Sequence, residues 1–497
     1  MEFSEEIALA GDVGLKQLKE AFVSNLHGST MAEIAALTAV VPTFIILRQL
    51  GGLILPAAKE DVTSSDGEVK GDRSLALGGP NYRTRLLSDF IFVILPTLAC
   101  LTVLADWIYI ITGFSLVLTL IGVLLLRRTK YQSNVDLYPQ VVSKETSSRR
   151  TGFLSYFRFT MMLVTCVSIL AVDFNVFPRR YAKTETYGTG LMDVGVGSFV
   201  VANGLVSRQA RNLPPSKYGG VLRNTSPLLV IGFARLILTK GVDYQEHVAE
   251  YGVHWNFFFT LAAVALLTSL IHVPAAYCGS LAVVILGGYQ ASLSFGLNKY
   301  LLSSERGPGL ISLNKEGVYS IFGYWSMYLI SVRLGNYLCC LPERFFSQGA
   351  NGSSYGKKNG ATKWWIVIDV WLLDAIFCVL ASIDACNWGD SHVHRGFSQC
   401  NLAYVLFVLA QNLEVIAIFL TADSMLPPRV MPLLRIFDQN MLATFLWANI
   451  LTGLVNMSMQ TIFAPTHVAM GALSSYLACL VGGMGIVDAL GLKLKFW

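Results

Sequence analysis

The chain has 497 residues, of which 54% are hydrophobic and only 14% are charged, and its formal net charge is +5. A soluble domain carries about 25% charged residues, so this composition excludes an ordinary soluble fold and indicates a polytopic membrane protein. The basic residues lie in short loops rather than in a continuous stripe, which argues against a nucleic-acid partner.

Long apolar runs recur along the whole chain, and about 20 apolar residues are enough to cross about 30 Å of hydrocarbon. We therefore predict an all-α fold with about 13 transmembrane helices in one bundle. Residues 1–30 are expected to form an N-terminal segment with an interfacial helix, residues 31–490 a single membrane domain, and residues 491–497 a short tail. The predicted spans are residues 31–50, 86–106, 108–126, 153–172, 189–206, 226–242, 255–273, 275–297, 318–338, 364–384, 401–422, 441–458 and 467–490.

The distribution of Lys and Arg predicts how these spans are oriented. About 22 of these residues lie on the side of the membrane that holds the C-terminus and residues 51–85, 127–152, 207–225, 342–361 and 423–440, and about 10 lie on the side of the N-terminus. Because cytosolic loops are enriched in positive charge, we expect a lumenal N-terminus and a cytosolic C-terminus. The N-terminal residues lack a basic stretch before an apolar core, so we expect no cleaved signal peptide.

Several ionisable residues lie in the apolar runs or at their ends, where a charge costs about 2.5–3.5 kcal/mol at the bilayer centre. Most of them are expected to pair between helices or to lie at the headgroup level. Asp173 differs from the others, because three basic residues follow it in one loop: Arg179, Arg180 and Lys183. An acid close to several bases at the lip of a span is the pattern of a functional site.

A second polar cluster precedes the seventh predicted span. On a continuous helix His247 would share a face with Glu250, Tyr251 and His254, and such a face can transfer protons. An aromatic belt at the membrane surface explains Trp255 and the phenylalanines after it equally well. The spacing of the His and Glu residues matches no metal-ligand signature, so no metal site is predicted.

These motifs resemble those of the PIG-W family, the inositol acyltransferases of glycosylphosphatidylinositol (GPI) anchor synthesis, which includes the fungal GPI-anchored wall transfer proteins. The resemblance extends over nearly the whole chain. Its longest motif begins with residues 169–174, which include Asp173, and continues with Phe177, Pro178, Arg179, Arg180, Ala182, Lys183, Glu185, Gly188, Thr189, Met192, Asp193, Gly195, Val196 and Gly197. The second runs from Tyr244 to Phe258, and shorter ones comprise residues 19–28, 85–90 and 314–317, with Asn449, Thr452, Gly453 and Asn456. The chain departs from the family at Asn175, where Pro is usual, and at residues 394–400, which lack an expected pair of arginines.

The resemblance implies transfer of a fatty acyl chain from acyl-CoA, with palmitoyl-CoA as the expected donor, to the inositol 2-hydroxyl of glucosaminyl-phosphatidylinositol in the endoplasmic reticulum membrane. Membrane lipids are the other expected partners, and no bound cofactor is expected. The family's catalytic pair falls on Asp173 and Lys183, with His247 and His254 as alternative bases. The candidate substrate-binding residues are Arg179, Arg180, Glu185, Asp193, Arg235, Glu246, Glu250, Tyr251, Trp255, Asn256, Asn314, Lys315, Glu316, Asn449 and Asn456.

The chemistry of these residues suits acyl transfer. An inositol hydroxyl needs a base, and the thioester carbonyl develops negative charge that needs a donor. Asp173 and Lys183 are ten residues apart, which excludes a simple helical pair, so we expect the turn at Pro178 to fold Lys183 back over Asp173. Arg179 and Arg180 are candidates for binding a phosphate of CoA or of the phosphoinositide, or for anchoring to lipid headgroups.

Two other classes of protein remain open from the sequence. A proton-coupled transporter of a polar or lipid substrate also needs many helices and charges within the membrane, but it moves its substrate without consuming acyl-CoA. A noncatalytic scaffold for other enzymes of the pathway would do neither. Neither rich motif contains a Ser or Cys nucleophile, so direct transfer is favoured over an acyl-enzyme.

Overall fold

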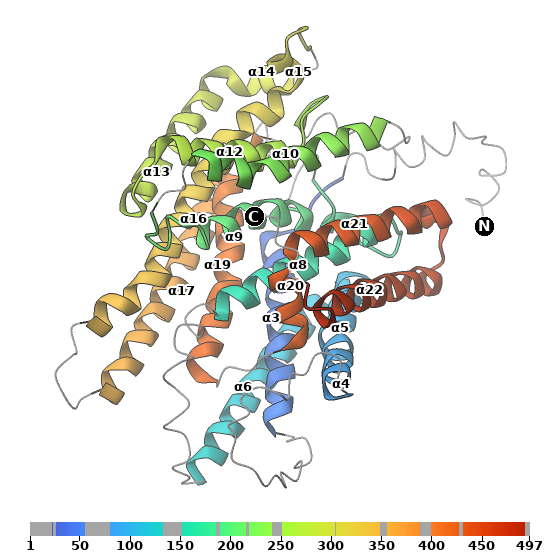
Figure 1. The fold of residues 1–497 in the computed structure, drawn as a ribbon, viewed down its shortest axis with the longest axis vertical. Coiled ribbons are helices and arrows are strands. Elements are labelled where there is room, and N and C mark those ends of the chain that lie inside the picture. The colour runs from blue at the N-terminus through green and yellow to red at the C-terminus, as the bar shows by residue number, and fades with distance from the viewer. Residues whose placement is uncertain are drawn as a thin grey trace. The chain divides into compact units, whose positions relative to one another are not determined.

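The computed structural model describes residues 22, 26–54, 80–132, 152–184, 189–214, 218–240, 251–303, 305–347, 355–387, 399–426 and 431–492. Within these residues all regular structure is helical, apart from one isolated antiparallel bridge between Ser29 and Thr189 (Figure 1). The predicted all-α fold is therefore confirmed for the described part of the chain. The interfacial helix was predicted within residues 1–30, of which the structure describes only residues 22 and 26–30, so it stays a prediction.

The chain divides into two compact units, each made of segments that are distant in sequence. Unit 1 contains residues 1–31 and 179–413, and unit 2 contains residues 32–178 and 414–495. One division follows Pro178, inside the long motif, and another falls within helix α19, Leu402–Met425. Both units include parts of the 31–490 domain expected from the sequence.

Unit 1 is organised around its long helix α16, which packs against α9, α12 and α13, while α10 lies alongside α12 (Figure 1). Small polar side chains on α16, such as Ser320, Ser326 and Ser331, are buried and bond to carbonyls of the same helix, which lets neighbouring helices approach closely. The helices of this unit are α9 (Leu191–Leu205), α10 (Tyr218–Lys240), α12 (Phe257–Ile271), α13 (Ala275–Ser292), α14 (Asn298–Leu302), α15 (Leu310–Leu313), α16 (Lys315–Ser347), α17 (Tyr355–Asn387) and the first half of α19, with the helical turns η4 (Arg179–Tyr181) and η5 (Leu293–Leu297).

Unit 2 contains a group of packed helices in which α8 contacts α20, α21 and α22, and α21 runs beside α22 (Figure 1). Phe159 of α8 meets Phe437 of α20 edge to face, with ring centroids 5.4 Å apart. The helices of this unit are α3 (Met31–Ile54), α4 (Pro80–Asp89), α5 (Leu95–Leu101), α6 (Ile108–Gln132), α8 (Gly152–Ala171), α20 (Pro432–Gln439), α21 (Met441–Ser458) and α22 (Thr466–Ala489), with the turns η2 (Phe90–Ile94), η3 (Ala105–Trp107) and η6 (Thr461–Phe463).

The charged residues of unit 2 pair between helices. Three ion pairs join different elements: Arg48 to Asp89 at 3.2 Å, Arg158 to Asp438 at 2.7 Å, and Arg435 to Asp488 at 2.7 Å. Two of them involve α20, a short helix in a segment that the sequence predicted as a loop. Its buried face, formed by Leu433, Ile436 and Phe437, explains why it folds against its neighbours.

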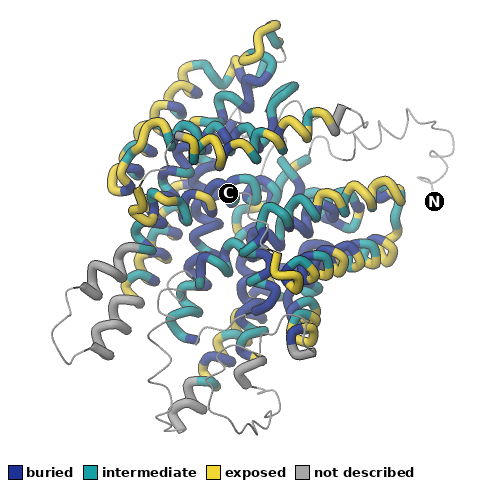
Figure 2. The backbone as a smooth tube through the Cα atoms, viewed as in Figure 1, coloured by how far each residue is buried: buried dark blue, intermediate teal, exposed yellow. Residues whose placement is uncertain are grey.

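Nine helices in the described residues are long and apolar enough to cross a membrane. Each of the thirteen predicted spans coincides with helical structure, but α9 and α12 have only 15 residues each, and α10 and α16 do not meet the same criterion. The total of about 13 spans and the orientation of the termini therefore stay predictions. The lateral face of α6 is exposed and apolar, as expected for a helix that faces lipid, whereas α9 is largely buried (Figure 2).

Candidate active site

Asp173 lies in unit 2, in the turn that ends α8. The amide of Asp173 bonds to the carbonyl oxygen of Leu170 at 3.1 Å, and the amide of Phe174 bonds to that of Ala171 at 3.0 Å, which closes the end of the helix. The side chains of Phe174 and Phe177 are both 0% exposed. These two buried rings anchor the turn, while Asp173, in the same turn, stays partly accessible.

Asn456 reaches this carboxyl from the last turn of α21, which packs against α8. Its Nδ2 donates a hydrogen bond of 2.8 Å to Oδ2 of Asp173. The two residues belong to different motifs of the sequence, 283 positions apart. The fold therefore brings together, within one unit, a predicted catalytic acid and a residue predicted only as a substrate contact.

Lys183 lies in unit 1, next to Thr184, which is hydrogen-bonded to the first turn of α9. The Oδ2 atom of Asp193, in the first turn of α9, accepts bonds from the amide of Thr184 at 3.2 Å, from its hydroxyl at 2.7 Å and from the amide of Gly190 at 3.1 Å. A carboxylate in this position also interacts favourably with the positive end of the helix dipole. Asp193 thus fixes Thr184, which directly follows Lys183 in the chain. Lys183 itself is half-buried.

Thr189 and Asp193 form two further contacts in unit 1 that the sequence did not predict. Ser29 and Thr189 exchange backbone hydrogen bonds of 2.9 and 3.0 Å, which ties the N-terminal segment to the loop. The hydroxyl of Tyr404 on α19 donates to the carbonyl oxygen of Asp193 at 2.8 Å. Thr189 belongs to the longest motif and Ser29 directly follows the motif at residues 19–28, whereas nothing in the sequence around Tyr404 indicated the second contact.

The two adjacent arginines stack on aromatic rings. The guanidinium carbon of Arg179 lies 4.0 Å from the centroid of Phe22, and that of Arg180 lies 5.1 Å from the centroid of Tyr181, which is fully buried. Stacking orients the planar guanidinium groups and suits Arg better than Lys. Phe22 belongs to the motif at residues 19–28, and the sequence did not predict its contact with Arg179.

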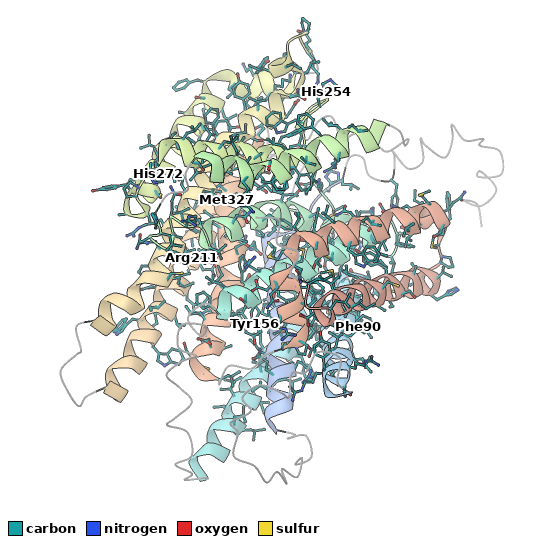
Figure 3. All side chains as sticks on the ribbon, in the orientation of Figure 1. Phe90, Tyr156, Arg211, His254, His272 and Met327 are labelled. Atoms are coloured by element: carbon teal, nitrogen blue, oxygen red, sulfur yellow. The ribbon has the colours of Figure 1, made fainter. Side chains whose placement is uncertain are left out.

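The second polar cluster is not one continuous helix, so the predicted shared face that included His254 is wrong. Gly252 has a φ of +102°, and the chain is irregular from there until α12 begins at Phe257. Glycine adopts this conformation without a steric penalty, which breaks the helical spacing. Figure 3 shows His254 and His272 near the two ends of α12. Glu246, His247 and Glu250 lie outside the described residues.

The residues on either side of this break have structural partners. Asn256 caps α12: its Oδ1 accepts from the amides of Phe258 and Phe259 at 3.1 and 3.3 Å, and its Nδ2 donates to a carbonyl of α10 at 2.9 Å. The indole nitrogen of Trp255 donates to the hydroxyl of Thr260 at 2.9 Å. The Tyr251 hydroxyl oxygen is buried. Roles of these residues in substrate binding stay predictions.

The third motif fastens the loop before α16. Oδ1 of Asn314 accepts from the amide of His254 at 2.7 Å, and Glu316 forms an ion pair with Arg306 at 2.7 Å. Lys315 is 0% exposed, and its ammonium donates to the carbonyls of Tyr300 and Ser303, both at 2.7 Å. These partners are the compensation that a buried charge requires. The geometry therefore gives the motif a scaffolding role, and substrate contacts of its side chains stay predictions.

The remaining candidates are dispersed. Arg235 is exposed on α10, Asn449 is exposed on α21 and donates to the carbonyl of Phe445 in its own helix at 2.7 Å, and Glu185 lies outside the described residues. Asp173 and Lys183 belong to different units, so the predicted folding of Lys183 over Asp173 stays a prediction.

The long apolar helices, with charged loops at their ends, define a multi-pass membrane protein. The family model described as GWT1 matches residues 15–487, and the chain belongs to this family. It is 42% identical to an uncharacterized protein of Arabidopsis thaliana over 91% of this chain and 98% of that protein. It is 33% identical to the phosphatidylinositol-glycan biosynthesis class W protein of Dictyostelium discoideum, over 83% of this chain and 88% of the relative. It is also 34% identical to GPI-anchored wall transfer protein 1 of Aspergillus oryzae, over 97% and 100% of the two chains.

Proposed function

We propose that this protein is the inositol acyltransferase of GPI-anchor biosynthesis, acting in the endoplasmic reticulum membrane. It would transfer a fatty acyl group from acyl-CoA, with palmitoyl-CoA as the expected donor, to the inositol 2-hydroxyl of glucosaminyl-phosphatidylinositol. Membership of the GWT1 family supports the pathway. The observation that carries the reaction is the hydrogen bond from Asn456 to the Asp173 carboxyl; in unit 1, Asp193 binds Thr184, the residue after Lys183.

In this reaction Asp173 accepts the proton of the inositol hydroxyl as its oxygen attacks the thioester carbonyl carbon. A carbon–oxygen bond forms, and the carbonyl oxygen becomes negatively charged in the tetrahedral intermediate. The ammonium of Lys183 stabilises this charge. The intermediate collapses with cleavage of the carbon–sulfur bond, and the CoA thiolate takes up the proton, directly or through Asp173. The products are the inositol ester and CoA, so atoms and charge balance without any further reactant.

Direct transfer is favoured over an acyl-enzyme. Cys400, the cysteine nearest to α19 in sequence, is fully buried, and burial raises the pKa of its thiol well above the usual value. A thiol in this state is a poor nucleophile. His254 remains the alternative base, with its backbone fixed by Asn314.

Arg179 and Arg180 are the proposed phosphate ligands. A guanidinium that lies over a ring keeps its N–H groups in its own plane, where two of them can bind one phosphate. CoA and the phosphoinositide both carry phosphates, and the structure favours neither. Each arginine replaced by Ala should raise KM for the substrate whose phosphate it binds.

The test is an acyl-transfer assay on purified full-length protein with acyl-CoA and glucosaminyl-phosphatidylinositol. We expect wild-type protein to form acylated product, and Asp173→Asn and Lys183→Ala each to abolish it while the protein stays inserted and folded. Asp106→Asn and Lys299→Ala are matched controls, because both residues are exposed and neither belongs to one of the sequence motifs. Near-normal turnover by Asp173→Asn or Lys183→Ala would remove that residue from the mechanism. Substrate flux without acyl-CoA consumption would identify a transporter, and no activity of either kind would identify a scaffold.

A further inference from the structure

The position of Asp173 is electrostatically unfavourable for a carboxylate. It directly follows the C-terminal end of α8, where the carbonyl groups of the last turn carry partial negative charge. Anions are stabilised at the opposite end of a helix. A base in this position therefore needs a donor that stabilises its charged form.

The amide of Asn456 is such a donor. Its Nδ2 lies 2.8 Å from Oδ2 of Asp173, and both residues belong to unit 2. An ionised carboxylate only accepts hydrogen bonds, so the amide donates to it in the charged state. The same bond restricts rotation of the carboxyl group about its Cβ–Cγ bond. Asn456 comes from the last turn of α21, and the packing of α21 on α8 holds the two helix ends together.

We propose that Asn456 is a positioning residue for Asp173, rather than the substrate contact that its motif suggested. It keeps the carboxylate charged and correctly oriented to accept the hydroxyl proton. This inference rests on the proposed function, because Asp173 acts as a base only in that reaction. It differs from a substrate-binding role in a measurable way, since a positioning residue affects the chemical step and a substrate contact affects binding.

The expected effect follows from the orientation of the carboxylate, because the bond to Asn456 weakens as Asp173 accepts the proton and loses its charge. Losing the correct orientation of a general base lowers the rate by about 10- to 100-fold. Asn456→Ala should therefore reduce kcat by about this factor and leave KM for acyl-CoA and for glucosaminyl-phosphatidylinositol within about twofold of wild type. Asn456→Asp keeps the shape but sets an oxygen against Oδ2 of Asp173, so it should lose at least as much. Asn456→Gln retains the amide and should recover part of the activity.

The experiment measures kcat and both KM values for the three variants and for Ser458→Ala in the purified full-length protein. Ser458 is a matched control on the same helix end, because it is exposed and donates only to the carbonyl of Val455 in its own helix. A fall in kcat at constant KM, with partial recovery in Asn456→Gln and no change in Ser458→Ala, supports the proposal.

Three other outcomes overturn it. Wild-type kcat in Asn456→Ala means that the bond does not serve the reaction. A rise in KM at constant kcat restores the substrate-contact interpretation. Failure of both Asn456→Ala and Asn456→Asp to yield folded protein assigns the side chain to the fold, although Asn456 is exposed. Inactive wild-type protein is a separate result, which refutes the proposed function itself.

Discussion

The three hydrogen bonds accepted by Asp193 make this residue the strongest test of how the Lys183 loop is held. Its side chain is buried, with 3% of its area exposed, and one oxygen receives donors from Thr184 and Gly190. Asp193→Ala removes all three bonds and leaves the two amides without this acceptor. Asp193→Asn keeps an oxygen of the same shape but removes the charge.

A hydrogen bond to a charged group contributes about 1.5–3 kcal/mol and a neutral one about half of that. The three bonds share one acceptor and are partly buried, so they do not add fully. We expect Asp193→Ala to destabilise unit 1 by about 3–5 kcal/mol and Asp193→Asn by about 1–2 kcal/mol. At about 2–4 °C per kcal/mol for a domain of this size, the alanine variant should melt about 10 °C lower.

The assay is thermal unfolding of the detergent-purified protein, followed by the loss of monodisperse protein after heating, together with acyl-transfer activity below the transition. Ser292→Ala is the control, since Ser292 is exposed and donates only to a carbonyl of its own helix. We expect an order of stability from wild type through Asp193→Asn to Asp193→Ala, with kcat falling in the same order because Lys183 adjoins Thr184. An alanine variant that melts and turns over like wild type would refute the idea that Asp193 holds the loop.

Two further predictions concern packing and topology. A Cβ atom on Gly323 of α16 would lie 2.0 Å from the backbone carbonyl oxygen of Cys400, so Gly323→Ala should lower the melting temperature of the protein. Gly287→Ala is the control and should not lower it, because a Cβ atom at Gly287 would have no atom within 4 Å. Equal melting temperatures of the two variants would contradict this packing. Sequons engineered beside Lys183 should be glycosylated if the N-terminus is lumenal, and the natural sequons at Asn224 and Asn351 should not. Gel mobility after glycosidase treatment tests this, and the reverse pattern would mean that a span has been miscounted.

Apolar periodicity predicted the helices well because each span must satisfy its backbone hydrogen bonds internally, so its existence depends on local composition alone. Helix boundaries depend on single residues with special geometry. Gly252 and Asn256 illustrate this dependence: the first permits a positive φ and the second caps α12, and together they place His254 outside any helix. The expectation of a shared helical face failed there because periodicity carries no information about such breaks.

The composition and order of the chain are sufficient to predict an all-α membrane protein and to single out Asp173 with the basic residues that follow it, since hydrophobic length and charge at the ends of apolar runs are local properties. The pairing of Asp173 with Lys183 came from the family resemblance. The partners of those residues are decided only by tertiary packing. Asn456 meets Asp173 because α21 packs on α8, across 283 positions of sequence. The buried Lys315 binds carbonyls of the preceding loop, although its motif resembled a ligand site. Hydrogen bonds act over a few ångströms in space, and distance along the chain does not reveal which polar side chains will come within that range.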